Sequence, residues 1–250
     1  KDTDMSAVKY VMYGAAPIPL DLLREAVQTI PGAGFLQCYG MTETTGTIAM
    51  LPPEDHALDG NQRMRSAGKA VPGAELKVIG EDGGELPCGE VGELICKSPS
   101  NMIGYWNLPD ATRGALKDGW MHTGDAAYMD EDGYVYIQDR IKDMIISGGE
   151  NVYPAQVESA IYGHPAVSEV AVIGVPDETW GEAVKACVVP KPGTTVDPDD
   201  IIAFTRERLA GFKVPKTVEV IDAMPRNPSG KILRRELRAP FWEGRDRQVN

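Results

Sequence analysis

The segment Tyr39-Gly-Met-Thr-Glu43 combines three side chains with complementary chemistry. A tyrosine ring offers a face on which a purine can stack, and a threonine hydroxyl can bond a phosphate oxygen. A glutamate carboxylate can hold Mg²⁺, a hard cation that prefers oxygen ligands. Each residue also has an ordinary interpretation, since Tyr39 could be a core aromatic and Thr42 and Glu43 a helix cap beside a surface acid.

A second candidate is Asp125, which follows Thr123 and Gly124. It could close an Asx-turn, or its carboxylate could accept hydrogen bonds from both hydroxyls of a ribose. The neighbouring His122 is better explained as a partly buried histidine with its hydrogen bonds satisfied than as a chemical participant. His56 lies among Pro, Asp and Gly residues and is expected at the surface.

A third candidate is Lys231, in the Gly- and Pro-rich stretch that begins at Pro225. A lone lysine usually lies at the surface. The Gly-Lys pair is not a phosphate loop, because that motif needs a second Gly five residues earlier and a Ser or Thr after the Lys. Pro225 and Ile232 stand in those places.

Two kinds of organisation are expected before residue 142. A βα unit comes first, with strands at 8–13 and 34–38 and a helix at 19–29, because apolar residues recur there at strand and helix spacing. Short apolar runs separated by Gly turns then predict a mostly antiparallel barrel or sheet. Its clearest strands are 75–79, 91–97, 126–129 and 134–137.

The rest of the chain predicts a compact α/β module. Helices are expected at 154–162 and 199–209, and strands at 167–175, 182–189 and 217–221. The overall fold class is therefore mixed, α/β and α+β.

Bulk properties narrow the class of protein. Hydrophobic residues make up 42% and charged residues 25%, as is ordinary for globular chains. A net charge of −12 disfavours a nucleic-acid partner. The four cysteines show no Cys-x-x-Cys pairing and no signal peptide is evident, so a reduced, cytoplasmic chain is expected. No apolar run approaches the roughly 18 residues of a membrane helix.

Several motifs together resemble the adenylate-forming superfamily, which includes acyl-CoA synthetases, adenylation domains of peptide synthetases and beetle luciferases. The central ones are Thr123-Gly-Asp125, Asp139-Arg140, Lys142-Asp143 and Ser147-Gly-Gly-Glu-Asn-Val-Tyr-Pro154. The stretch 39–43 is similar to the family's Tyr-Gly-x-Thr-Glu motif, and 225–231 to its Pro-x₄-Gly-Lys catalytic loop. Ile146 stands where many members carry a lysine.

The resemblance implies two lobes. Residues 1–141 would form the C-terminal part of a large adenylate-binding lobe, with βα units at 1–61 and a barrel-like region at 62–141. Residues 142–250 would form a small mobile domain that carries the catalytic lysine, with Lys142 as the hinge. A typical member has a Ser/Thr/Gly-rich phosphate loop upstream of Gly14, so the chain is expected to match the C-terminal half of a member. Whether it is active alone stays open.

The implied activity is that of an ATP-dependent acyl-CoA synthetase using ATP, Mg²⁺ and coenzyme A. The catalytic residues would be Lys231, Thr42 and Glu43, with Glu43 as the metal ligand. The resemblance assigns contacts with the nucleotide or with CoA to a larger set: Gly14, Ala15, Ala16, Pro17, Gln37, Cys38, Tyr39, Gly40, Met41, Asp125, Ile137, Arg140, Ser147, Gly148, Gly149, Glu150, Trp180 and Phe212. For the two last aromatics, a place in the core is the alternative.

The partners follow from the same resemblance. The carboxylic acid substrate is expected to be a medium- or long-chain fatty acid, with an aromatic acid as the alternative. Other interpretations are an adenylation domain that loads a carrier protein, and a non-catalytic module that binds adenylate or CoA. A homodimer stays open.

Overall fold

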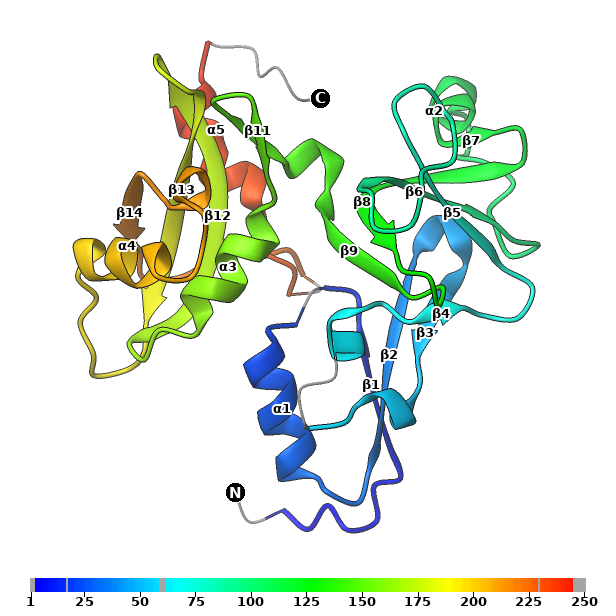
Figure 1. Ribbon diagram of the computed structural model, residues 1–250, viewed down its shortest axis with the longest axis horizontal. Coiled ribbons are helices and arrows are strands. Elements are labelled where there is room, and N and C mark those ends of the chain that lie inside the picture. The colour runs from blue at the N-terminus through cyan, green and yellow to red at the C-terminus, as the bar shows by residue number, and fades with distance from the viewer. Residues whose placement is uncertain (1–2, 17, 59–61, 229, 245–250) are drawn as a thin grey trace. The chain divides into compact units, whose positions relative to one another are not determined.

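The computed structural model describes residues 3–16, 18–58, 62–228 and 230–244. The chain forms two compact units, Lys1–Gln138 and Asp139–Asn250. Unit 1 has two sheets and unit 2 has one (Figure 1), and each unit has its own cluster of buried side chains. None of the helices in these described ranges combines the length and the apolar character that crossing a membrane requires.

The first sheet of unit 1 has the order β1-β2-β3-β4, with bounds Tyr10–Gly14, Gly34–Met41, Gly46–Leu51 and Lys69–Ala70. Strands β1 and β2 are parallel and are connected through helix α1 (Leu20–Thr29), as the βα pattern predicts. Leu23 of α1 is fully buried in a cluster with Phe35 and Met64. Short 3₁₀ turns follow β2 and β3, at Thr42–Thr44, Pro53–Asp55 and Gln62–Arg65.

The second sheet of unit 1 is antiparallel, with the order β5-β6-β8-β7 and with β9 paired to β8. The bounds are Glu75–Ile79 for β5, Gly92–Lys97 for β6, Leu116–Lys117 for β7, Trp120–Met129 for β8 and Val135–Arg140 for β9; helix α2 spans Pro109–Ala115. Strand β8 begins six residues before the predicted start at 126, and therefore contains the Thr-Gly-Asp motif. The predicted fold class is confirmed.

Unit 2 has one sheet, with the order β11-β10-β13-β12 and with β14 paired to β13. The strands are Ile145–Ser147 (β10), Glu150–Val152 (β11), Val167–Asp177 (β12), Gly181–Pro190 (β13) and Thr217–Val220 (β14). The helices are Pro154–Tyr162 (α3), Pro198–Arg206 (α4) and Arg234–Trp242 (α5), with 3₁₀ turns at Ile141–Asp143 and Gly211–Lys213. The helix predicted at 154–162 has these bounds because Pro154 occupies its first position.

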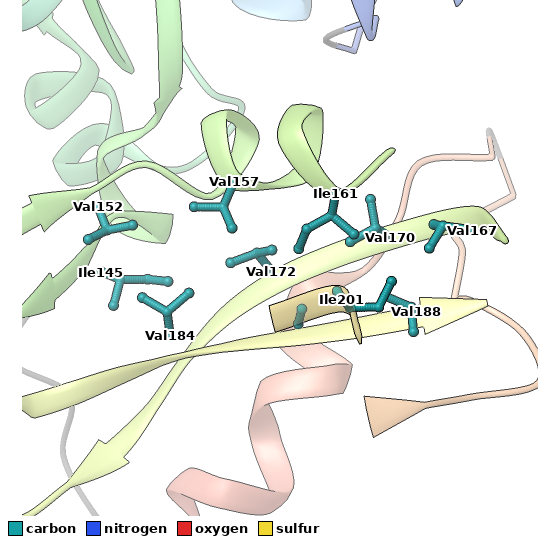
Figure 2. Close-up of a cluster of buried hydrophobic side chains, with 11 residues drawn as sticks. Ile145, Val152, Val157, Ile161, Val167, Val170, Val172, Val184, Val188 and Ile201 are labelled. Carbon is teal, nitrogen blue, oxygen red and sulfur yellow. The ribbon is translucent and has the colours of Figure 1, made fainter. Parts of the chain in front are cut away.

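Both faces of the unit 2 sheet are covered. Val170 and Val172 belong to a buried cluster that includes Val157 and Ile161, which project from α3 toward the strands (Figure 2). The alternate residues of β12 belong to a second cluster, which includes Leu237 of α5. This alternation follows from the two-residue period of a strand.

The prediction that His56 lies at the surface is wrong. The residue is only 6% exposed. Its Nε2 lies 2.8 Å from the Tyr13 hydroxyl, and its Nδ1 lies 2.9 Å from the Pro52 carbonyl oxygen. Burial lowers the pKa of His56. The neutral ring therefore donates from Nδ1 and accepts from Tyr13, and it links β1 to the loop after β3.

Candidate active site

The turn after β1 is held by a close approach between two backbones. A Cβ added at Gly14 would lie 2.0 Å from the carbonyl oxygen of Cys38, so only glycine fits here. Ala15 has a φ of +64°, in the left-handed region, and Ala15 and Ala16 are both exposed. Pro17 lies outside the described residues. Because β1 and β2 are parallel, the exposed small-residue turn sits at the carboxyl ends of both strands, the edge where open sheets bind ligands.

Gln37 carries a buried acceptor beside this turn. Its Oε1 atom is shielded from solvent and has no hydrogen-bond partner among the residues that the structure describes. A buried amide oxygen without a donor is costly, so this atom is suited to accept a bond from a bound ligand. Cys38, Gly40 and Met41 continue the strand as half-buried residues.

Tyr39 and Asp125, 86 positions apart, meet in unit 1. The Tyr39 hydroxyl donates to Asp125 Oδ2 at 2.5 Å, and the carboxylate is 7% exposed. The Tyr39 ring packs against an apolar cluster of the second sheet, against which Ile137 also packs. The Thr123 hydroxyl accepts the Asp125 amide at 3.1 Å and donates to the Leu94 carbonyl at 2.7 Å. The orientation of the carboxylate is therefore set by β2, β6 and β8 together.

Glu43 is held by a second tyrosine. The Tyr105 hydroxyl donates to Glu43 Oε1 at 2.8 Å, and the Met102 amide donates to the Glu43 carbonyl at 2.7 Å. The buried Thr44 hydroxyl accepts the Met41 amide and donates to a backbone carbonyl that flanks the 3₁₀ turn, that of Met41 at 3.0 Å or that of Gly46 at 2.8 Å. This turn leaves Thr42 exposed and Glu43 half-buried beside it.

These oxygens fit a magnesium ion that is shared with a phosphate. Within the described ranges, no group of three or more His, Cys, Asp or Glu side chains could hold a metal by itself. Mg²⁺ usually keeps several waters and is bound through one or two carboxylates plus substrate phosphates. A single oriented carboxylate, Glu43, next to the exposed Thr42 hydroxyl meets that requirement.

In unit 2 the Gly148-Gly149 pair forms the turn between β10 and β11. Both glycines have positive φ, +63° and +84°, as a two-residue hairpin turn needs. The turn is flanked by the paired residues Ser147, which is buried, and Glu150, which is exposed. A Cβ at Gly148 would lie 2.7 Å from Cε3 of Trp180, so the indole covers the turn.

Trp180 is fixed at the turn between β12 and β13. Asp177 Oδ1 accepts the amides of Thr179 and Trp180, and the Trp180 carbonyl accepts the Gly148 amide at 2.8 Å. The indole is 45% exposed, and Lys216 Nζ lies 5.1 Å from the centre of its ring. The structure thus brings Trp180 and the Gly pair together, on a surface with an aromatic face and a cation.

Phe212 occupies a different environment. It is partly buried against the main core of unit 2, and Lys213 Nζ lies 5.4 Å from its ring centre. Lys213 Nζ also donates to Gln156 Oε1 at 2.6 Å. Packing against the core accounts for Phe212, and its contact with CoA stays a prediction.

Lys231 lies in a loop whose described residues are joined by backbone hydrogen bonds. The Lys231 amide donates to Asn227 Oδ1 at 2.8 Å, and the Asn227 amide donates to the Lys231 carbonyl at 2.9 Å. Arg226 donates to the Gly230 carbonyl and pairs with Glu169 on β12. Ile232 packs against the sheet. The loop is therefore anchored at its base while the Lys231 side chain is exposed.

The charged segment at the start of unit 2 is also ordered. Asp139 is buried, and its Oδ1 accepts the Arg140 amide at 2.8 Å. Burial raises the pKa of Asp139 to about 6, against the opposing effect of the Arg234 guanidinium. Lys142 is exposed in the following 3₁₀ turn, Ile141–Asp143. The roles of Arg140 toward ribose and of Lys142 as hinge stay predictions.

Comparison with known proteins decides the family. A model of AMP-binding enzymes matches residues 1–106, and a model of the AMP-binding enzyme C-terminal domain matches residues 156–231. The chain belongs to the adenylate-forming superfamily. It is 51% identical over 99% of its length to the fatty acid–[acyl-carrier-protein] ligase ScoC of Streptomyces coeruleorubidus, of which it covers 47%.

Other members of the superfamily match over a similar extent. The chain is 45% identical to a feruloyl-CoA synthase of Amycolatopsis, covering 96% of the chain and 48% of that protein. It is 43% identical to the medium/long-chain-fatty-acid–CoA ligase FadD8 of Mycobacterium tuberculosis, covering 98% and 44%. The chain thus spans about half the length of these curated relatives.

Solved structures of adenylate-forming enzymes share the fold. The amide bond synthetase McbA of Marinactinospora thermotolerans aligns with a TM-score of 0.87 at 38% identity, over 96% of this chain and 48% of that one. The o-succinylbenzoate CoA synthetase MenE of Bacillus subtilis, in complex with its acyl-adenylate intermediate, aligns at 0.83 with 39% identity, over 91% and 45%.

Sequence reasoning missed the residues that hold the superfamily motifs in place. Thr44, Tyr105, Asp177 and Asn227 were not singled out, although each bonds a predicted site residue or its turn. Asp177 and Asn227 sit two to four residues before their targets, a spacing typical of Asx-type bonds, so they could have been found. Tyr105 bonds a residue 62 positions away, and no local pattern indicates that.

Proposed function

We propose that the protein containing this chain is an ATP-dependent acid–thiol ligase. A carboxylate oxygen attacks the α-phosphorus of ATP, the bond to the β-phosphate oxygen breaks, and acyl-adenylate and pyrophosphate result. A thiolate then attacks the acyl carbon, and AMP leaves with the electron pair of the acyl–oxygen bond. The first step needs mainly positioning and neutralisation of charge.

One observation supports this proposal most directly, the hydrogen bond between Tyr39 and Asp125. The sequence assigned the two residues separately, one to a purine and the other to a ribose. A nucleoside presents its base and its ribose within one molecule, so the two groups that recognise it must lie together. The 2.5 Å bond meets that requirement.

The remaining groups would act on the phosphates. Lys231 would neutralise charge between the substrate carboxylate and the α-phosphate, a task that suits a long, flexible ammonium group. Thr42 would donate to a phosphate oxygen. Glu43 would hold Mg²⁺, which when bound neutralises phosphate charge. Arg140 would contact the ribose or a phosphate.

The thioester step would use the other surface of unit 2. After rotation about Lys142, the Gly148-Gly149 turn would let the narrow pantetheine arm of CoA pass close to backbone. Trp180, with one indole face against Gly148 and its ring 45% exposed, supplies a surface on which the CoA nucleotide could pack.

We favour a medium- or long-chain fatty acid as the substrate. Support comes from the relatives named for fatty acids, ScoC at 51% identity and FadD8 at 43%. Aromatic acids are the second candidate, because the feruloyl-CoA synthase is 45% identical. The acceptor thiol has two candidates as well, since ScoC is named for an acyl-carrier protein rather than for CoA.

The test is AMP formation from ATP by the product of the complete open reading frame that contains this chain. Fatty and aromatic acids would be compared with no thiol, with CoA and with a phosphopantetheinylated carrier protein. We expect acid- and thiol-dependent AMP release, reduced at least about 100-fold in Lys231→Ala, since removal of one preorganised electrostatic group costs that much. Binding of AMP by a folded protein that stays silent with every acid would overturn the ligase proposal and favour a non-catalytic module.

A further inference from the structure

Arg234, at the first position of α5, belongs to a partly buried group of five charged side chains. Its guanidinium binds Glu158 of α3 through two parallel bonds, Nε to Oε1 at 3.0 Å and one terminal nitrogen to Oε2 at 2.7 Å. The other terminal nitrogen lies 3.5 Å from Asp139 Oδ1 and 3.8 Å from Asp143 Oδ2. One guanidinium therefore contacts three carboxylates.

Two of these carboxylates, Asp139 and Asp143, come from the segment with which unit 2 begins. Asp139 Oδ2 also accepts the Ala155 amide at 2.8 Å, and so satisfies a donor in the first turn of α3. Asp143 Oδ1 lies 3.5 Å from Arg238, one turn further along α5. Both ends of the segment 139–143, which contains the predicted hinge Lys142, are thus tied to the helices of unit 2.

The arrangement depends on Arg234 more than on its neighbours. The side chains of Arg234, Glu158 and Asp143 are about one-fifth exposed or less, and Asp139 is 4% exposed. With three acids against Arg234 and Arg238, removal of Arg234 would leave mostly uncompensated negative charge in a poorly solvated place. A lysine could not reproduce the contact, because it lacks the planar fork that binds Glu158 with two nitrogens.

Arg234 is also three residues from Lys231. Ile232 lies between them and packs against the sheet, and Leu233 donates its amide to the Pro225 carbonyl at 2.8 Å, closing the base of the loop. The path from the guanidinium to the lysine is therefore short and ordered.

We propose that Arg234 is a positioning residue that joins the Lys231 loop to the segment 139–143, so that the lysine and the predicted hinge move as one body. The consequence for chemistry rests on the proposed function. If the Lys231 loop moved independently of the rest of unit 2, rotation of unit 2 into position would not by itself orient Lys231. The rate of adenylate formation would then fall.

The first test does not depend on activity. Hydrogen–deuterium exchange would compare wild type with Arg234→Gln, using Arg235→Gln as the matched control, because Arg235 is the exposed next residue of the same helix. We expect Arg234→Gln to speed exchange about tenfold both in peptides covering 139–145 and in those covering 225–233, and the control to change neither. Faster exchange in only one of the two segments, or in neither, would overturn the coupling.

Arg234→Lys is a second variant, for use if Arg234→Gln does not fold. It keeps one positive charge among the carboxylates but not the paired contact with Glu158. If Arg234→Gln does not fold, the same two segments are compared in Arg234→Lys, with the same two outcomes.

The second test is a double-mutant cycle on acid-dependent exchange of pyrophosphate into ATP. We expect Arg234→Gln to slow pyrophosphate exchange about tenfold when Lys231 is present, but less than about twofold in the Lys231→Ala background. The second effect is small because Arg234, if it acts through Lys231, has no lysine left to position. Equal losses in both backgrounds would show that Arg234 does not act through the lysine. If the wild-type protein does not exchange pyrophosphate into ATP, the result counts against the proposed function. The hydrogen–deuterium exchange experiment would still decide whether Arg234 couples the Lys231 loop to the segment 139–143.

Discussion

Tyr39 takes part in the core of unit 1 through its ring and in the candidate nucleotide site through its hydroxyl. One side chain is therefore compatible with both interpretations of Tyr39, as a core aromatic and as a residue that contacts the nucleotide. Its packed ring cannot turn freely, so the hydroxyl is held on Asp125.

Replacement of Tyr39 by Phe should weaken nucleotide binding without loss of the fold. A hydrogen bond to a charged group contributes about 1.5–3 kcal/mol, so we expect a rise of about tenfold to 100-fold in the Kd for ATP. If Asp125 binds ribose, the rise should be smaller for an ATP analogue that lacks one ribose hydroxyl. Calorimetric titration of both nucleotides measures this.

Tyr136→Phe is the matched control for that experiment. Its hydroxyl also donates to a carboxylate, Asp130 at 3.0 Å, in the same unit. An equal loss of ATP affinity in both variants would mean that the hydroxyl of Tyr39 has no special relation to the nucleotide.

At the scale of elements, the two glycines of the β10–β11 turn are not equivalent. Both have positive φ, but only Gly148 lies under Trp180; a Cβ at Gly149 meets nothing within 4 Å. Substitution of either residue costs the conformational strain of an L-residue in the left-handed region. Only the change at Gly148 also displaces the indole.

Gly148→Ala and Gly149→Ala therefore form a matched pair. We expect a similar loss of stability from strain in each, about 1–2 kcal/mol, with an additional loss and a shift in Trp180 fluorescence in Gly148→Ala alone. The CoA concentration at half-maximal rate should rise in Gly148→Ala more than in Gly149→Ala. Equal fluorescence and equal CoA dependence in the two variants would contradict the packing of Trp180 on the turn.

Asp139 makes the stability of unit 2 depend on pH. Its pKa is about 6 in the folded protein, above the unfolded value of 3.8, so its favourable contribution is complete below pH 3.8 and is lost as pH rises through 6. From pH 5 to pH 7 the free energy of unfolding should fall by about 1 kcal/mol through this group.

Asp139→Asn should remove that part of the pH dependence. The measurement is the protection of the β12–β13 amides against exchange at pH 5 and pH 7, in wild type and variant. If amide protection changes by the same factor between pH 5 and pH 7 in wild type and in Asp139→Asn, Asp139 does not titrate in this range.

The elements could be predicted where their signals are local. The amphipathic pattern after Pro154 defined α3, and β-branched residues defined β12 and β13. Helix α5 was missed, because it contains Pro240 and charged residues dominate its first turns; contacts with β12 stabilise it instead. Strand β8 was predicted too short because Gly124 interrupts its pattern, whereas the strand continues through that glycine beside a shift in register with β6.

The full set of site residues could be named only through the resemblance, and the partners that bond them from distant parts of the chain could not be named from the sequence. Tyr39 and Asp125 lie on different sheets of unit 1, and Glu43 meets Tyr105 across 62 positions. Such contacts depend on how the sheets pack, which no local spacing in the sequence records.

At the scale of the whole molecule, the two units divide the proposed chemistry. The residues proposed for adenine and Mg²⁺ belong to unit 1, and Lys231 and the Gly pair belong to unit 2. The predicted hinge, Lys142, lies four residues into unit 2. A change that limits rotation there should therefore affect the two half-reactions unequally.

Lys142→Pro tests this, because proline fixes φ near −65°. We expect pyrophosphate exchange to change less than about threefold, and transfer of the acyl group to the thiol to slow about tenfold or more. Lys142→Ala, which removes the side chain and keeps the backbone free, should change both rates little. Equal slowing of both half-reactions by Lys142→Pro would contradict a hinge at this position.

Strand β9 runs from one unit into the other, so that Gln138 and Asp139 are consecutive residues of a single extended segment. The connection therefore has almost no slack. In the proposed reaction, Lys231 would therefore be tethered to unit 1 at a high effective concentration, and it would reach the nucleotide by rotation about few dihedral angles rather than through the motion of a flexible linker. A few Gly-Ser residues inserted after Gln138 would lower the effective concentration of Lys231 at unit 1 without changing any residue of the site. The length of this junction would therefore adjust the rate of adenylate formation.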